Sequence, residues 1–159
     1  MSHTPAIATD FDFEFGEWTV RHRRLKERLV GCEEWEEFTG TSQTRPVLGG
    51  SGNIQDNLLH FPSGDYRAIA IRAFDSARKT WAIWWLADTD PHQFDVPVIG
   101  RFEGGVGTFL ADDTLRGQPV IVRFLWLRTY TQTPRWEQAM SADGGTRWET
   151  NWTMDFTRA

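Results

Sequence analysis

Segments in which apolar and polar residues alternate follow one another along nearly the whole chain, separated by residues typical of turns. An alternation with a period of two is what a β-strand with one buried face requires. The separating residues lie at 30–31, 48–52, 62–65, 75–80, 88–95, 104–105, 116–119 and 143–145. Segments of about 8–12 residues with such regular turns are typical of an antiparallel β-meander.

A meander of about ten strands leaves two unpaired edges, and closure into a barrel removes both of them. We therefore predict an all-β protein in which an antiparallel meander of about ten strands closes into a lipocalin-like barrel. Such a barrel can enclose a cavity for one ligand. Because 159 residues fit one domain, this domain is predicted to span residues 10–159, after a flexible N-terminal tail at 1–9.

The composition limits the partners and the compartment of the protein. The net charge of −5 gives no preference for polyanions, and no apolar run approaches the length of a membrane helix. Cys32 is the only cysteine, so an intramolecular disulfide is excluded, and the N-terminus lacks the features of a signal peptide. We predict a cytoplasmic protein that binds neither nucleic acid nor membranes.

The basic segment 21–29 can be interpreted as a helix or as a strand, in which Trp18, Val20, His22 and Arg24 share one face and Thr19, Arg21, Arg23 and Leu25 the other. The acidic segment 33–42 favours a hairpin between the two segments, because opposite charges then face each other. The matched pairs are Arg28 with Glu33 and Arg24 with Glu37, or, with a loop one residue longer, Arg28 with Glu34 and Lys26 with Glu36. Either pairing neutralises the basic face that phosphate binding would need.

The segments 66–74 and 80–88 form a second predicted hairpin, in which Phe74 pairs with Trp81 and Arg72 shares a face with aromatic residues. The opposite face is wholly apolar and consists of Ile69, Ile71, Ala73, Ala82, Trp84 and Leu86. Segment 119–127 is also apolar on both faces, except at Arg123. Such faces indicate either a covering element or a subunit contact. Since exposed apolar patches usually mark interfaces, the subunit contact predicts a homodimer.

The abundance of tryptophan predicts an aromatic-lined cavity that binds a small apolar or anionic metabolite. The predicted ligand-binding residues are Arg72, Trp81, Trp85, Arg123, Trp126, Trp136 and Trp152. Arg72 is the expected anchor for a ligand carboxylate or enolate, held between aromatic faces. The alternative for each arginine is a stabilising pair with Glu103, Glu137 or Asp155.

A second hypothesis is an enzyme on the same barrel, of the isomerase, cyclase or hydrolase type, with an arginine at an oxyanion and a carboxylate moving a proton. The weak catalytic candidates are Glu137, Arg101 and His22, and Glu149 is a further possible base. A third hypothesis is a dimeric interaction module without a ligand. The four histidines and one cysteine lack metal-ligand spacing, and the glycine-rich stretches lack the phosphate-loop pattern, so no metal or other cofactor is predicted.

Ser141, Asp143, Gly145 and Trp148 have the spacing S-x-D-x-G-x-x-W, which resembles the Asp-box turn of sialidase-type propellers. The motif occurs once, whereas a propeller needs repeats, so we interpret it as the last hairpin of the barrel. A three-residue loop at 143–145 would align a lining stripe of Trp136, Met140, Trp148, Trp152 and Met154. The same register places Glu137 and Glu149 on the outer face, which lowers the support for an enzyme.

Three stretches, FEFGEWTVRHRRL, GRFEGGVGTF and RWEQAMSADGGTRWETNWTMDF, resemble a bacterial domain-of-unknown-function family with a lipocalin-like, calycin-type barrel. The resemblance extends from about Phe11 to Arg158 and implies an internal cavity but no catalytic residues. Nitrobindin and the fatty-acid-binding barrels are more distant in shape, and no motif places a haem ligand.

Overall fold

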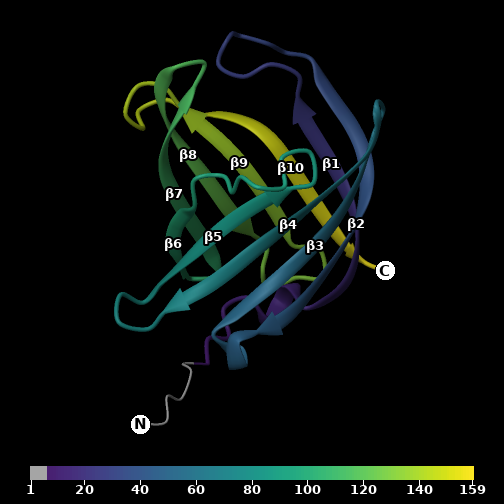
Figure 1. The fold of residues 1–159 in the computed structure, drawn as a ribbon, viewed down its shortest axis with the longest axis vertical. Coiled ribbons are helices and arrows are strands. Elements are labelled where there is room, and N and C mark those ends of the chain that lie inside the picture. Colours follow the sequence, from purple (N-terminus) through teal and green to yellow (C-terminus); the bar gives the residue numbers. More distant parts are fainter. Residues whose placement is uncertain (1–6) are drawn as a thin grey trace.

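The structure is a computed structural model that describes residues 7–159. Ten antiparallel strands form one closed barrel, in which each strand pairs with the next and β1 pairs with β10 (Figure 1). The strands are β1 (Gly16–Leu25), β2 (Trp35–Val47), β3 (Gly52–Phe61), β4 (Gly64–Asp75), β5 (Thr80–Ala87), β6 (Val98–Glu103), β7 (Val106–Leu115), β8 (Gln118–Leu127), β9 (Arg135–Ser141) and β10 (Glu149–Arg158). Two short 3-10 helices are η1 (Asp12–Glu14) and η2 (Leu48–Gly50). The predicted all-β meander barrel is confirmed.

The inner face of β1 carries the alternating residues Trp18, Val20 and His22, all buried, so segment 21–29 starts as a strand and continues as a loop. Both predicted registers of this hairpin are wrong: Arg23 faces Glu37 and Arg24 faces Glu36. Paired residues point to the same side of a sheet. Since the inner residues His22 and Phe38 must pair, a shift by one residue would turn one strand's core side chains outward.

The hairpin of β4 and β5 has the predicted register, with Phe74 opposite Trp81 and Arg72 opposite Ile83. Its inner face is buried, and the outer residues of the predicted apolar face are all partly exposed. The apolar outer face continues through Ile99, which pairs with Ala82 and is 51% exposed. A homodimer through this face stays a prediction, which sedimentation equilibrium would test.

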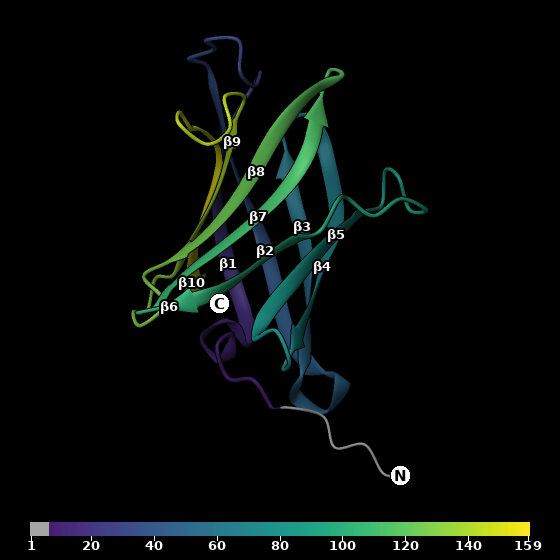
Figure 2. The ribbon, with the colours of Figure 1, turned by 90° about the vertical axis from the view of Figure 1, so that its left-hand side faces the viewer.

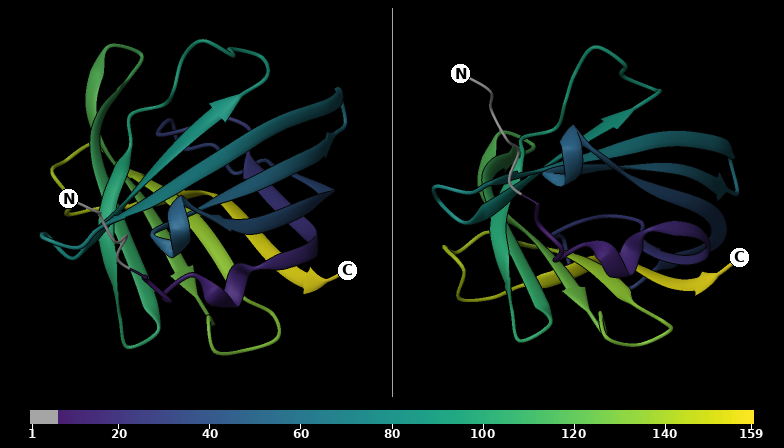
Figure 3. Two further views of the ribbon diagram at one scale, coloured as in Figure 1. Left: turned by 60° about the horizontal axis from the view of Figure 1, so that its bottom comes forward. Right: turned by 90° about the horizontal axis from the view of Figure 1, so that it is seen from below.

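The lower end of the barrel is filled by the N-terminal segment, where η1 crosses beneath the strands (Figures 2 and 3). The Phe11 ring is 1% exposed and packs edge-on against Trp81 and Phe102, with both centroid distances 4.9 Å. The loops between β1 and β2, β7 and β8, and β9 and β10 lie at the opposite, upper end (Figure 2). Most of the predicted tail, residues 1–6, lies outside the described residues, and the Ala8 N–H donates to the Gly50 carbonyl oxygen.

The register predicted for the last hairpin is wrong, because Met140 pairs with Glu149 and Trp136 with Met154. The Asp143 carboxylate accepts hydrogen bonds from the backbone N–H groups of residues 146 and 147, which lengthens the turn beyond three residues. A β-bulge at residue 151 shifts the register again. Paired with the inner residue Met140, Glu149 therefore lies on the inner side of the sheet, not on the outer face as expected.

The outcome for the predicted lining stripe is mixed. Trp136, Met140, Trp152 and Met154 are buried in the core. Trp148 is not part of that face, because the longer turn carries its ring onto the Arg123 guanidinium, 4.3 Å from the ring centroid.

Gly100 on β6 lies where β7 approaches too closely for any side chain. A Cβ at this position would be 1.8 Å from the Thr108 carbonyl oxygen. Because a backbone oxygen cannot move aside without opening the sheet, Gly100→Ala is expected to lower the free energy of unfolding by about 1–3 kcal/mol. Urea denaturation measures the loss, with Thr114→Ala on the exposed face of β7 expected to stay within about 0.5 kcal/mol of the wild type. Equal stability of the two variants would contradict the close approach.

Candidate functional site

Two adjoining spaces lie inside the barrel. The mouth pocket, of about 120 Å³, is lined by Arg24, Arg28, Tyr66, Trp85, Asp95, Phe124, Trp136, Gln138 and Trp152. The inner cavity, of about 20 Å³, lies closer to η1 and is lined by Gln55, Ala70, Arg72, Ile83, Trp85, Phe124, Trp126, Trp136 and Met154. Trp85, Phe124 and Trp136 belong to both linings, so these three rings separate the two spaces.

Arg72 is fully enclosed beside the inner cavity, on the predicted inner face of β4. Its guanidinium lies over the Phe11 ring, 4.5 Å from the centroid, and over the Trp126 ring at 5.4 Å. One guanidinium nitrogen donates to the Asn53 side-chain oxygen at 3.0 Å. Burial lowers the pKa of Arg72 to about 10, against the raising influence of Glu14. The predicted setting of Arg72 between aromatic rings is therefore present in the structure.

The nearby charge that acts on Arg72 is Glu14, the last residue of η1, whose side chain is also fully buried and forms no ion pair with Arg72 within 4.0 Å. Glu14 accepts a hydrogen bond from Gln55 Nε2 at 2.7 Å, and Gln55 in turn accepts one from Asn57. Burial raises the pKa of Glu14 to about 7, although the charge of Arg72 acts in the opposite direction. Glu14 Oε2 and Arg72 Nε have no hydrogen-bond partner among the described residues. The inner cavity, which Arg72 lines, has room for about one water molecule.

The walls of the mouth pocket are aromatic, and their polar edges are bonded to one another. The Trp85 indole N–H donates to the Tyr66 hydroxyl at 3.2 Å, and the Trp152 indole N–H donates to His22 Nδ1 at 3.1 Å. Trp136 packs edge-on against Trp152 at 5.4 Å and against Phe124 at 4.9 Å. The pocket therefore offers ring faces, with the indole N–H groups of Trp85 and Trp152 already occupied.

Two arginines reach this pocket from β1 and from the loop that follows it. The Arg24 guanidinium lies over the Trp152 ring at 5.0 Å and over the Phe61 ring at 5.5 Å. Burial lowers the pKa of Arg28 to about 10, and the positive charge of Arg24 lowers it further. Burial is also the main cause that lowers the pKa of Arg24. Neither guanidinium forms an ion pair within 4.0 Å with any acidic group of residues 7–159.

The structure brings together four of the predicted ligand-binding residues at the inner cavity, Arg72, Trp85, Trp126 and Trp136, and adds Trp152 at the mouth pocket. Trp81 is buried below them, where its indole N–H donates to Asp10 at 2.9 Å. Arg123 is not in this group, because it lies outside the barrel on the Trp148 ring.

The weak catalytic candidates do not meet in one place. Glu137 pairs with Arg135 at 3.0 Å on the outer face, as expected for it, and Arg101 is exposed. His22 is buried and stacked on Phe38 with a centroid distance of 4.7 Å, and burial lowers its pKa to about 3. A neutral imidazole that already accepts the Trp152 N–H is part of the packing between β1 and β10.

Sequence reasoning missed Glu14, Arg24, Arg28 and Tyr66 as lining or neighbouring residues. A signal existed for Arg24, because the strand interpretation placed it on one face with Trp18 and His22, and this face is the inner one in the structure. For Glu14 there was none, since the residues before β1 do not reveal that they fold back under the barrel.

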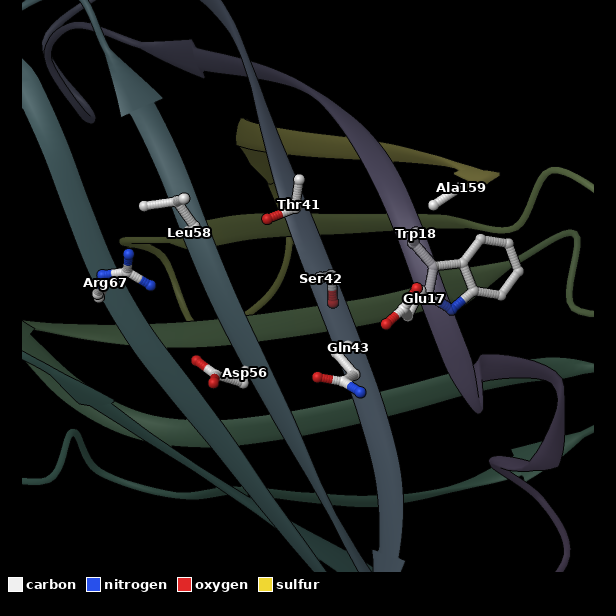
Figure 4. Close-up of a pocket in the computed structure, with 9 residues that line it drawn as sticks. All are labelled: Glu17, Trp18, Thr41, Ser42, Gln43, Asp56, Leu58, Arg67 and Ala159. Atoms are coloured by element: carbon white, nitrogen blue, oxygen red, sulfur yellow. The ribbon is translucent and has the colours of Figure 1, made fainter.

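A larger groove, of about 290 Å³, lies on the outer surface across β1 to β4 (Figure 4). Most of its lining is exposed and polar, including Glu17, Gln43, Asp56 and Arg67. It offers a ligand little enclosure, because ligand sites are concave and mainly apolar. The barrel interior is therefore the better candidate site.

In the part of the chain from residue 7 onward, no three His, Cys, Asp or Glu side chains gather as metal ligands would, and no helix has the length and apolar character needed to cross a membrane. The resemblance to a bacterial family with a calycin-type barrel stays a prediction, although the closed antiparallel barrel that it implied is present. Comparisons of the chain with family models and with curated proteins found no match.

Proposed function

We propose that the protein binds a small, mainly apolar molecule inside the barrel, with its ring or chain in the mouth pocket. The observation that carries this proposal is a space of about 120 Å³ at the mouth of the barrel, walled mainly by the rings of Trp85, Phe124, Trp136 and Trp152. Burial of a ligand against these rings supplies the hydrophobic driving force, at about 25 cal/mol per Å² of apolar surface.

The size of the space limits the ligand. A cavity of about 150 Å³ accepts benzene in a well-packed protein, and the mouth pocket and inner cavity are about 120 and 20 Å³. A single aromatic ring or a short branched chain fits this space, whereas a long fatty chain requires the core to open.

A reaction inside the barrel has less support than binding. Glu14 and Arg72 are the carboxylate and arginine closest to the hypothesis of an oxyanion anchor with a proton-moving base. Only Arg72 lines the inner cavity, which has the size of about one water molecule, and Glu14 is fully buried. A substrate cannot reach both groups without displacing the rings that separate the inner cavity from the mouth pocket. Our proposal is therefore binding, without a chemical step.

Titration with benzyl alcohol, a neutral one-ring probe, tests the proposed function by isothermal calorimetry. We expect saturable binding to the wild type and at least tenfold weaker binding to Phe124→Trp, because the larger ring occupies both spaces that Phe124 lines. The matched control is Leu125→Trp, which adds the same ring to a partly exposed outer position of the same strand and should leave affinity unchanged. Equal affinities of the wild type and Phe124→Trp, or no binding of any one-ring probe, would refute an interior site.

A further inference from the structure

The mouth pocket holds two positive charges that the protein leaves without a direct partner. Arg24 and Arg28 both line the pocket, and they are close enough for the charge of one to lower the pKa of the other. Both side chains are only partly exposed. Arginines in partly apolar surroundings are normally paired, because desolvation of an unpaired charge is costly. An anion bound between them would supply the missing partner.

A third group at the same place can take part in binding an anion. The Tyr66 hydroxyl accepts the Trp85 indole N–H at 3.2 Å, and its own proton is given to no other group of residues 7–159 in the hydrogen bonds that we find. Burial raises the pKa of Tyr66, so the hydroxyl keeps this proton at neutral pH. The Tyr66 proton and the two guanidinium groups are therefore all available as donors in the lining of one aromatic pocket.

The acidic groups near the pocket restrict the charge of the anion. Asp95 lines the pocket from the loop between β5 and β6, and Glu149 accepts a hydrogen bond from the backbone N–H of Leu29 at 2.7 Å. Both carboxylates favour the charged form of Arg28, as Glu36 does for Arg24. These carboxylates offset part of the positive charge of Arg24 and Arg28. The charge that remains suits a ligand with one negative charge better than a ligand with two.

We propose that the ligand of this site is a one-ring aromatic carboxylate, whose ring lies against Trp85, Trp136 and Trp152 and whose carboxylate binds Arg24, Arg28 and the Tyr66 hydroxyl. The inference rests on the proposed function and adds the chemical class of the ligand. It moves the expected anionic anchor from Arg72, which Glu14 and Asn53 already accompany in a closed cavity, to the upper end of the barrel. Arginine forks fit the planar carboxylate group, and hydrogen bonds that involve a charge are the stronger ones.

Benzoate and benzyl alcohol form the pair of probes that separates this inference from the proposed function. They share the ring and differ in the anionic group. With the full-length wild type we expect benzoate to bind at least tenfold more tightly, and phenyl phosphate, which carries about two negative charges, to bind more weakly than benzoate. Isothermal calorimetry at one fixed salt concentration gives all three affinities.

Variants identify the groups responsible. Arg24→Gln and Arg28→Gln are each expected to weaken benzoate binding about tenfold or more, in line with the cost of losing a hydrogen bond to a charged group. Both residues line the pocket, so benzyl alcohol binding changes too, but by a smaller factor, and the ratio of benzoate affinity to benzyl alcohol affinity falls in each variant. Arg28→Gln lies in a loop between strands, so it tests the inference even if Arg24→Gln, on β1, fails to fold. The matched control is Arg123→Gln, which removes a guanidinium stacked on tryptophan outside the barrel and should leave benzoate affinity unchanged.

Each result supports or overturns a separate statement. If benzyl alcohol binds with the expected sensitivity to Phe124→Trp and benzoate binds no better, the carboxylate inference is wrong and the proposed function stands. If phenyl phosphate binds more tightly than benzoate, the carboxylate class is wrong. If neither one-ring probe binds the wild type, the proposed function is wrong.

Discussion

Replacing Phe11 by alanine is expected to lower the free energy of unfolding by about 3–5 kcal/mol, the range for removal of a buried aromatic side chain. Phe11 is 1% exposed although it precedes the first strand, and its ring contacts Trp81, Phe102 and the Arg72 guanidinium. The substitution removes these contacts together and opens the lower end of the barrel toward Arg72. The loss of dispersion contacts and the cavity that remains both contribute to the cost.

Urea denaturation followed by far-ultraviolet circular dichroism measures this loss, since the many tryptophans near the site complicate fluorescence. Phe94→Ala is the matched control, because it removes the same ring from a loop position that is 44% exposed. Its cost should be at most about 1 kcal/mol. Similar midpoints for the two variants would show that the N-terminal segment is not part of the barrel core.

The fold could be predicted from the sequence because each strand carries its own signal. The inner residues of β1, β4 and β5 repeat with a period of two, and the register of β4 with β5 followed from the tight connection that pairs Phe74 with Trp81. The two wrong registers have different causes. For β1 with β2, charge pairing was given more weight than the inner position of Phe38, and for β9 with β10 the bulge at residue 151 has no sequence pattern of its own.

The site was predictable in part, for the same physical reasons. Tryptophans on inner strand faces had to meet inside a closed barrel, and Trp85, Trp136 and Trp152 do so. The positions of the polar groups depend on the conformations of the segments that connect the strands, and the alternation within strands does not predict these conformations. Glu14 reaches Arg72 because η1 folds back under the strands, and Arg28 reaches the mouth pocket from a loop whose conformation includes a positive φ at Leu29. Charged residues that face inward from loops are therefore the part that needs a structure.

The Glu14→Gln variant is expected to become less stable as the pH falls from about 6.5 to 4.5, whereas the wild type should change little over this range. Glu14 has a pKa of about 7 in the folded protein and 4.5 as its ordinary value, because its carboxyl group is buried. The folded state therefore holds this proton more tightly than the unfolded state, and stability falls as pH rises from 4.5 to 7. His22 has the opposite effect on how stability changes with pH.

Burial lowers the pKa of His22 from 6.5 to about 3, so the unfolded state binds this proton more tightly and stability rises as pH rises from 3 to 6.5. Each group alone changes the free energy of unfolding by about 1.4 kcal/mol per pH unit. Between pH 4.5 and 6.5 the two slopes have opposite signs and cancel in the wild type.

When either Glu14 or His22 is removed, the pH dependence of the free energy of unfolding should follow the remaining group alone. Urea midpoints measured at intervals from pH 4.5 to 6.5 provide the readout. In Glu14→Gln only the His22 slope remains, and stability should increase by about 3 kcal/mol across the window. In His22→Asn, whose amide oxygen can still accept the Trp152 N–H, only the Glu14 slope remains and stability should decrease by a similar amount. The sign of each slope is independent of the absolute stability that either substitution costs. Parallel pH profiles for the wild type and both variants would mean that neither buried group keeps its shifted pKa, and that water enters both sites.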